Sequence, residues 1–266
     1  MVDGPLNIDA YSPSEIAARV ENAGVSKVNL SIQQTLVLGV LAGAFIAFGA
    51  VFYTFVITDT GLGFGLTRLV GGIAFSLGLI LVVVGGAELF TGNNLIVMGW
   101  ADGLISSRQL LRNWFWVYIG NFIGAIAIAG FVALSGVMEA GGGAVAKTAA
   151  SIAETKMAIP SIEAFTRGVL CNVLVCLAVW LCFAAHTVSG KILAIIFPIS
   201  AFVALGFEHS VANMYLIPAG YFAGAAGVTL NGFIANLIPV TLGNIFGGGV
   251  LVALVYWIVY LRKPEQ

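Results

Sequence analysis

Residues 206–213, Gly-Phe-Glu-His-Ser-Val-Ala-Asn, place a carboxylate and an imidazole side by side in a stretch that is otherwise apolar. No charged residue occurs from Ile192 to Phe207, and none follows from Ser210 to Gly232. A charged side chain at the centre of a bilayer costs about 2.5–3.5 kcal/mol or more, so such residues are kept for a function. Glu208 and His209 therefore predict a functional site inside a membrane domain.

The composition is that of an integral membrane protein. Of the 266 residues, 60% are hydrophobic and 9% are charged, and the mean hydropathy is +1.04. A soluble domain carries about 25% charged residues. The net charge of −1 gives no indication of a nucleic-acid partner. We interpret the cysteines as small apolar packing residues, because Cys171, Cys176 and Cys182 match no metal or redox spacing.

Six apolar segments are long enough to cross a bilayer as helices, so we expect an all-α membrane protein. Two of them are interrupted, the second by Glu88 and the fifth by Glu208-His209. The six segments are Leu36–Thr58, Leu69–Ala101, Asn113–Met138, Gly168–Ala185, Ile192–Tyr221 and Gly232–Leu261. A Gly/Ala-rich connection at Glu139–Pro160 is expected to be the one long loop.

Residues 1–29 form a polar segment before the membrane domain, which we place at residues 30–262, with 263–266 as a short tail. Ser12-Pro13-Ser14-Glu15 has the pattern of a capping box with proline at the first helical position. The pattern predicts a short amphipathic helix at about Ser14–Val25, on the membrane surface or under the pore mouth. A tail that only adds solubility is the alternative.

The basic residues predict the orientation. With the N-terminus inside, the inner segments hold Arg19, Lys27, Arg108, Arg112, Lys191, Arg262 and Lys263. The outer segments hold Arg68, Lys147, Lys156 and Arg167. By the positive-inside rule we expect both termini in the cytoplasm. We place the protein, as a multi-pass protein, in the cytoplasmic (inner) membrane.

The chain contains an internal repeat. Gly86, Glu88 and Asn93 in the second segment align with residues displaced by 120 in the fifth, namely Gly206, Glu208 and Asn213. The third and sixth segments align with a displacement of 123: Asn113, Val117, Gly120, Asn121 and Gly124 match Asn236, Val240, Gly243, Asn244 and Gly247. The first and fourth share Gly-Val-Leu at 39–41 and 168–170.

Because each repeat holds three crossings, the second copy must lie inverted relative to the first. We place the repeats at about 30–138 and 160–262. In inverted repeats the transported species binds near the midplane, where broken helices line a cavity. Since Glu88, Asn93, Glu208 and Asn213 recur in both copies, we expect them to support the two breaks. The repeat indicates a channel or transporter.

These residues resemble the signatures of the formate/nitrite transporter family. The resemblance rests on three stretches, 87–91 (Ala-Glu-Leu-Phe-Thr), 206–214 (Gly-Phe-Glu-His-Ser-Val-Ala-Asn-Met) and 236–244 (Asn-Leu-Ile-Pro-Val-Thr-Leu-Gly-Asn), and covers about Thr35–Arg262. It implies an aquaporin-like protomer with six transmembrane helices, the second and fifth broken, assembled as a homopentamer in the lipid bilayer. It also implies transport of formate, nitrite, hydrosulfide or, in some members, lactate.

The resemblance also implies roles for particular residues. The substrate-binding residues would be His209, Thr91, Asn172 and Lys156. The outer apolar constriction would contain Phe75, Leu79 and Phe202, and the inner one Leu89, Phe90 and Val175. The context after His209 is most similar to formate members, whereas Gly-Asn-Asn at 92–94 is closer to nitrite members.

A central histidine suits this chemistry because imidazole changes charge near physiological pH. As imidazolium it is a counter-ion, and as a proton donor it converts formate into neutral formic acid, so we expect pH-dependent flux coupled to protons. Three alternatives remain: a nitrite or hydrosulfide carrier, a neutral-solute pore for water or glycerol, and an intramembrane enzyme. An intramembrane enzyme would need a nucleophile or a metal cluster. A neutral-solute pore would not explain why a histidine is present at this position. No cofactor is implied.

Overall fold

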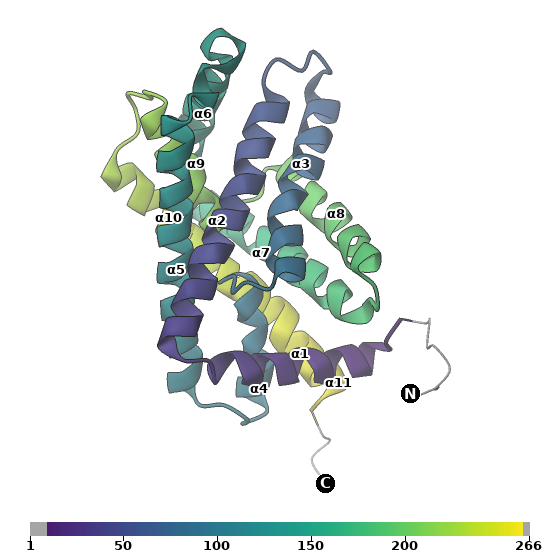
Figure 1. The fold of residues 1–266 in the computed structure, drawn as a ribbon. Helices are drawn as coiled ribbons and strands as arrows, with labels where there is room; N and C mark the ends of the chain where they lie inside the picture. The colour runs from purple at the N-terminus through teal and green to yellow at the C-terminus, as the bar shows by residue number, and fades with distance from the viewer. Residues whose placement is uncertain (1–9, 263–266) are drawn as a thin grey trace.

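The computed structural model describes residues 10–262; the tail expected at 263–266 and residues 1–9 of the N-terminal segment lie outside the described residues. The described part is helical throughout (Figure 1). Its elements are α1 (Pro13–Val28), α2 (Ile32–Ile57), α3 (Phe64–Gly85), η1 (Gly92–Ile96), α4 (Val97–Ala101), α5 (Ser107–Leu134), η2 (Val137–Glu139), α6 (Ala140–Met157), α7 (Ser161–Ala184), α8 (Val188–Leu205), α9 (Ser210–Phe222), α10 (Leu230–Ile245), η3 (Phe246–Leu254) and α11 (Val255–Tyr260).

Six helical spans among the described residues are long and apolar enough to cross a membrane, as the sequence predicts. They are α2, α3, α5, α7, α8 and the continuous α10–η3–α11 segment. Each carries a large exposed apolar surface, including side chains such as Phe131 and Phe197, which are 67% and 76% exposed. Such surface is stable only against lipid or another subunit, so this is a multi-pass membrane protein.

Capping boxes begin three of the helices. In α1, α2 and α5 the side chains of Ser12, Ser31 and Ser106 accept from the backbone at the third helical residue, and the side chain at that position returns the bond. The Ser106 box starts α5 at Ser107, six residues before the expected Asn113, because the mostly polar residues 107–112 belong to the helix.

The second and fifth helices are broken, as predicted. Helix α3 ends at Gly86 (φ 79°) and α8 ends at Gly206 (φ 74°). Both glycines adopt the left-handed conformation that ends a helix at little cost when no Cβ is present. The chain then continues without helical structure until η1 begins at Gly92 and α9 begins at Ser210. At the two breaks, backbone groups in the interior of the protein therefore need hydrogen-bond partners from outside their own helix.

The expected loop at Glu139–Pro160 is wrong, because this segment contains the helix α6. Its first turn is irregular, with Gly141, Gly142 and Gly143 at positive φ, and the regular part follows them. Alanine-rich sequence is the best helix former once such glycines are passed. Helix α6 packs against α9, and α1 packs against η1 and α4, so each broken helix has a helix beside its second half.

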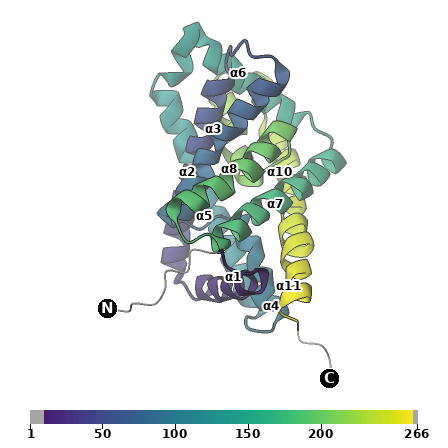
Figure 2. The ribbon, with the colours of Figure 1, turned by 90° about the vertical axis from the view of Figure 1, so that its right-hand side faces the viewer.

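The two halves share one arrangement. Helix α2 packs against α5, and α7 packs against α10, in crossings made close by glycines. Helices α1 and α11 lie at one end of the protein, whereas α6 lies at the opposite end in both views (Figures 1 and 2). Helix α1 thus relates to the first repeat as α6 relates to the second.

Candidate functional site

Each helix break is held by one asparagine from the third helix of its own repeat. Asn121 Oδ1 accepts from the Phe90 N–H at 2.9 Å, and its Nδ2 donates to the Gly39 and Glu88 carbonyls. Asn244 makes the matching bonds, accepting from Ser210 N–H and donating to the Gly168 and Glu208 carbonyls. Backbone groups freed in an apolar interior need such partners. Asn121 and Asn244, which align in the internal repeat, therefore form equivalent interhelical hydrogen bonds.

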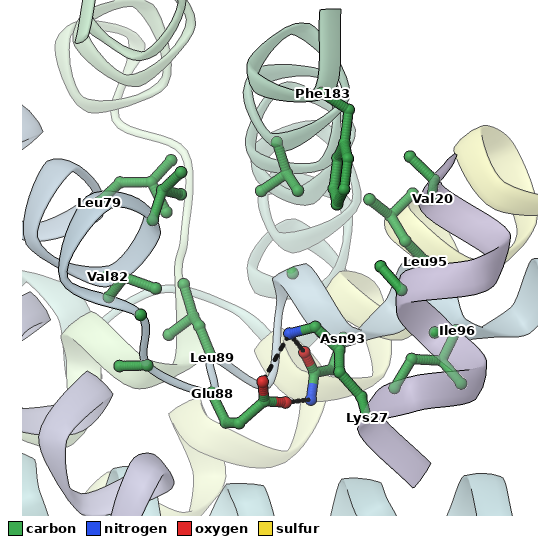
Figure 3. Close-up of a pocket in the computed structure, with 17 residues that line it drawn as sticks. Val20, Lys27, Leu79, Val82, Glu88, Leu89, Asn93, Leu95, Ile96 and Phe183 are labelled. Atoms are coloured by element: carbon green, nitrogen blue, oxygen red, sulfur yellow. Dashed lines mark hydrogen bonds and ion pairs between the residues drawn. The ribbon is translucent and has the colours of Figure 1, made fainter. Parts of the chain in front are cut away.

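A buried ion pair accompanies each break. Lys27 Nζ lies 2.8 Å from Glu88 Oε1, and Asn93 Nδ2 lies 2.7 Å from Glu88 Oε2 (Figure 3). Asn93 also donates to Asn113, which in turn donates to the Lys27 carbonyl. The four side chains form a closed circuit that joins α1, the break and α5.

The second break has the same circuit. Lys156 Nζ lies 2.8 Å from Glu208 Oε1, Asn213 donates to Glu208 and Asn236, and Asn236 donates to the Lys156 carbonyl. Each circuit compensates a buried carboxylate with a cation and hydrogen bonds, which removes most of its desolvation cost. Glu88 and Glu208 are fully engaged here, so they stabilise the breaks.

His209 and Thr91 meet at the centre of the protein. The Nε2 atom of His209 lies 3.0 Å from Thr91 Oγ1, and both residues are buried. His209 is also the N-cap of α9, because its Nδ1 accepts from the Ala212 N–H at 3.0 Å. A backbone N–H only donates, so Nδ1 carries a lone pair and the neutral ring has its proton on Nε2. The Nε2–H therefore donates to Thr91, whose own hydroxyl proton remains free for another acceptor.

A cavity approaches this pair from each side. One of them, which we call the outer cavity after the predicted orientation, has a volume of about 230 Å³ and is lined by Phe75, Phe202, Lys156 and His209 itself. The Phe202 ring stacks on the His209 imidazole, and Phe75 packs edge-on against Phe202. The inner cavity, about 320 Å³, is lined by residues that include Leu79, Val82, Leu89 and Lys27 (Figure 3). Apolar side chains thus flank His209 and Thr91 on both sides.

The other apolar residues implicated by the resemblance, Leu79, Leu89, Phe90 and Val175, belong to the same buried cluster as Phe75 and Phe202. Leu79, expected with Phe75 and Phe202, lines the inner cavity. Phe90 packs edge-on against the Trp114 and Tyr118 rings. Val175 is buried within the hydrophobic core.

Asn172 lies behind Thr91. Its Nδ2 donates to the Thr91 carbonyl at 3.3 Å, to Asn94 Oδ1 at 2.7 Å and to the Asn244 carbonyl at 2.7 Å. The Sγ of Cys176 lies 3.4 Å from the same Thr91 carbonyl, so both side chains position the threonine backbone. All three cysteines are free and buried, in keeping with packing.

Sequence reasoning missed Lys27 as a site residue. A signal was present, because Lys27 and Lys156 are displaced by 129 residues, the displacement that relates Gly39 to Gly168. Arg68 and Arg167, which line the outer cavity, were also missed. His186, the second histidine, is exposed beyond α7 and stacks on Tyr11 with ring centroids 4.2 Å apart.

Comparisons with known proteins agree with this architecture. Residues 14–258 match the family described as formate/nitrite transporter. The chain is 43% identical to the formate channel FocA of Escherichia coli (strain K12) over 99% of both proteins. It is also similar to a solved pentameric formate channel with formate bound (41% identity, TM-score 0.81, 87% of this chain and 98% of that one) and to a solved FNT family ion channel (31% identity, TM-score 0.85, 92% and 99%). On this evidence the protein belongs to the formate/nitrite transporter family.

Proposed function

We propose that this protein carries formate across the cytoplasmic membrane, as a homopentamer with one pore in each protomer. The observation that carries the proposal is the His209–Thr91 contact of 3.0 Å, a pair of hydrogen-bonding groups that lies between two cavities and has the apolar Phe202 ring stacked on it. The names of the relatives support formate as the anion and a pentamer as the assembly. The larger number of basic residues in the segments on the same side as the termini supports a cytoplasmic location of both termini.

The apolar side chains beside His209 and Thr91 favour the passage of a species with a low desolvation cost. Moving a bare carboxylate into a low-dielectric gap costs many kcal/mol, whereas neutral formic acid crosses at far lower cost. Lys156 lines the outer cavity and Lys27 the inner one, each paired with a glutamate, so each cavity has a cation in its lining. The hydroxyl proton of Thr91 is free to donate to one formate oxygen, and the His209 Nε2–H exchanges its bond to Thr91 for one to the other oxygen.

The source of the proton distinguishes two versions of this mechanism. Transfer from imidazolium to a carboxylate is uphill by about 3.5 kcal/mol in water, and a dry site favours the neutral products. However, an imidazolium would carry a proton on Nδ1, facing the Ala212 N–H that now donates to it. We therefore propose that His209 stays neutral and orients formate, and that the proton comes from hydronium ions of the bulk solution, which protonate formate in the cavities and leave water.

A pair of substitutions tests the proposal in proteoliposomes. His209→Asn keeps an acceptor for the Ala212 N–H and an N–H donor, but it cannot be protonated, and asparagine is a good N-cap. We expect formate flux that still rises as the pH falls from 8 to 5. His209→Phe removes both functions and is expected to lower flux about tenfold or more, with the pentamer intact by size-exclusion chromatography.

Two outcomes would contradict the proposal. Flux through His209→Asn that is independent of pH would assign the proton to imidazolium. Wild-type vesicles without formate flux would exclude formate as the substrate. Nitrite is the second candidate, favoured by Gly-Asn-Asn at 92–94, and a competition assay with formate, nitrite and hydrosulfide separates the three anions.

A further inference from the structure

Two arginines in the wall of the outer cavity have no counterpart in the inner cavity. Arg68 lies on α3 and Arg167 on α7, and both line the outer cavity. The displacement of 120 that relates Gly86 to Gly206 places Val188 at the position equivalent to Arg68. The displacement of 129 places Leu38 opposite Arg167. The lysine circuits occur in both repeats, whereas the two arginines occur only at the outer cavity. The outer cavity therefore carries more positive charge than the inner one.

The two guanidinium groups converge beside Gly206. A Cβ built on this glycine would lie 2.8 Å from Arg68 Nη2 and 3.8 Å from Arg167 Nη1. Each arginine is held by one bond to the end of α8: Arg68 Nε donates to the Ala204 carbonyl at 3.1 Å, and Arg167 Nη1 donates to the Gly206 carbonyl at 3.3 Å. These bonds orient both groups and leave other N–H groups of each fork unused by α8.

Only part of this positive charge is compensated. Arg167 pairs with Glu163, and Lys156 pairs with Glu208. Within residues 10–262, Arg68 has no ion pair, and its terminal nitrogens donate no hydrogen bond. The two guanidinium groups that converge beside Gly206 repel each other. An anion bound between them would attract both groups and offset this repulsion. A planar guanidinium presents paired donors that match a carboxylate.

We propose that Arg68 and Arg167 form an anion-capture site at the outer mouth, which takes up a small monovalent carboxylate before it reaches Lys156 and His209. This inference rests on the proposed anion transport and adds a difference between the two mouths. The inner cavity has Lys27 but no arginine in its lining. Capture should therefore lower the concentration needed for half-maximal entry from the outer side alone.

The competing interpretation gives the arginines a structural role, in which they only cap the carbonyl end of α8, where the helix dipole favours cations. Both interpretations predict only a small effect for Arg68→Lys, because lysine keeps a positive charge near the carbonyls. They differ for Arg68→Gln, because glutamine can still bond the Ala204 carbonyl while removing the charge. The matched control is Lys147→Gln on α6, which removes an exposed outer cation that is not part of the cavity lining.

Formate entry is measured in right-side-out and inside-out membrane vesicles at low ionic strength. We expect Arg68→Gln to raise the half-saturation concentration about two- to fivefold in one orientation only, the size expected for a partly exposed charge contact. The maximal rate and the opposite orientation should stay unchanged, Arg68→Lys should lie between, and Lys147→Gln should match wild type. In about 0.5 M salt the difference should shrink, because exposed charges are screened.

A second readout separates this inference from the proposed function. Saturation-transfer NMR on the formate proton, with solubilised protein, should give weaker binding in Arg68→Gln than in Lys147→Gln. If wild type carries formate but Arg68→Gln and Lys147→Gln behave alike in flux and NMR, the capture site is wrong and the proposed function stands. If wild type carries no formate, the proposed function fails and the NMR comparison alone decides the capture site.

Discussion

At the scale of single residues, Glu21 on α1 is a buried carboxyl with an unfavourable position. It packs against Gly99 of α4, and its Oε1 has no hydrogen-bond partner among the described residues. Burial raises the pKa of Glu21 above its ordinary value, and the nearby Asp102 carboxylate adds to this. Docking of α1 is therefore favoured when Glu21 is protonated, and it weakens as the pH rises from the ordinary pKa through the raised one.

Glu21→Gln should remove this pH dependence. Because the amide mimics the protonated acid, we expect stronger hydrogen-exchange protection of α1 at pH 7 than in wild type, and little difference at about pH 4. The control is Glu15→Gln at the start of the same helix, where hydrogen bonds from Ser12 lower the pKa of the exposed carboxyl. That substitution should not increase protection. Equal protection of α1 in wild type and Glu21→Gln at pH 7 would contradict the account.

The residues at the centre of the site were predictable for different reasons. His209 and Glu208 stand out because charge is costly in an apolar run, and Thr91 emerges through family resemblance. Lys27 was missed because it lies in a polar segment, where one more lysine carries no information. Its importance comes from Glu88, which is 61 residues away in sequence but 2.8 Å away in space. Only the repeat displacement that it shares with Lys156 could have identified it.

At the scale of helices, glycines make the same close crossing in each repeat. A Cβ at Gly124 of α5 would lie 2.8 Å from the Ala44 nitrogen on α2, and one at Gly247 would lie 3.0 Å from the Val169 carbonyl carbon on α7. Backbone atoms on a packed helix cannot move aside cheaply. Gly124→Ala and Gly247→Ala should therefore each destabilise the protein by about 1–3 kcal/mol, measured as thermal unfolding in detergent.

Gly130 provides the control on the same helix as Gly124. A Cβ there would meet nothing within 4 Å, so alanine should be neutral or stabilise α5 by up to about 1 kcal/mol through its helix propensity. Similar melting temperatures for Gly124→Ala and Gly130→Ala would disprove the packing argument. A large effect at Gly124 with none at Gly247 would instead limit the close crossing to one repeat.

Helix boundaries were less predictable than helix positions. The apolar spans were evident because bilayer thickness imposes their length, whereas α6 was hidden by Gly141, Gly142 and Gly143 at its start. The π-helical stretch η3, in the middle of the last span, gave no signal either. It brings Gly248 against the Asn172 side chain, and this contact depends on tertiary packing that local sequence does not encode.

At the scale of the whole protein, pseudo-symmetry separates scaffold from selectivity. The features that repeat are the glycine-capped breaks, the asparagines that hydrogen-bond to each break, the lysine–glutamate circuits and the helices α1 and α6 that carry those lysines. The features that do not repeat are His209, which faces Leu89 in the alignment, and the pair Arg68 and Arg167. The repeated groups stabilise the two helix breaks. The unrepeated groups, His209, Arg68 and Arg167, are therefore the ones that can select the anion and make entry differ between the two sides of the membrane.

The orientation of the whole chain can be tested with single cysteines, because Cys171, Cys176 and Cys182 are buried and should not react. Ser14 on α1 and Lys147 on α6 are exposed at opposite ends of the protein. With both termini in the cytoplasm, a membrane-impermeant maleimide should label Lys147→Cys on intact spheroplasts and Ser14→Cys only after permeabilisation. Wild-type protein should stay unlabelled in both conditions. The reverse pattern would show that the topology is inverted. The cavity lined by Arg68 and Arg167, which lies at the α6 end, would then open to the cytoplasm.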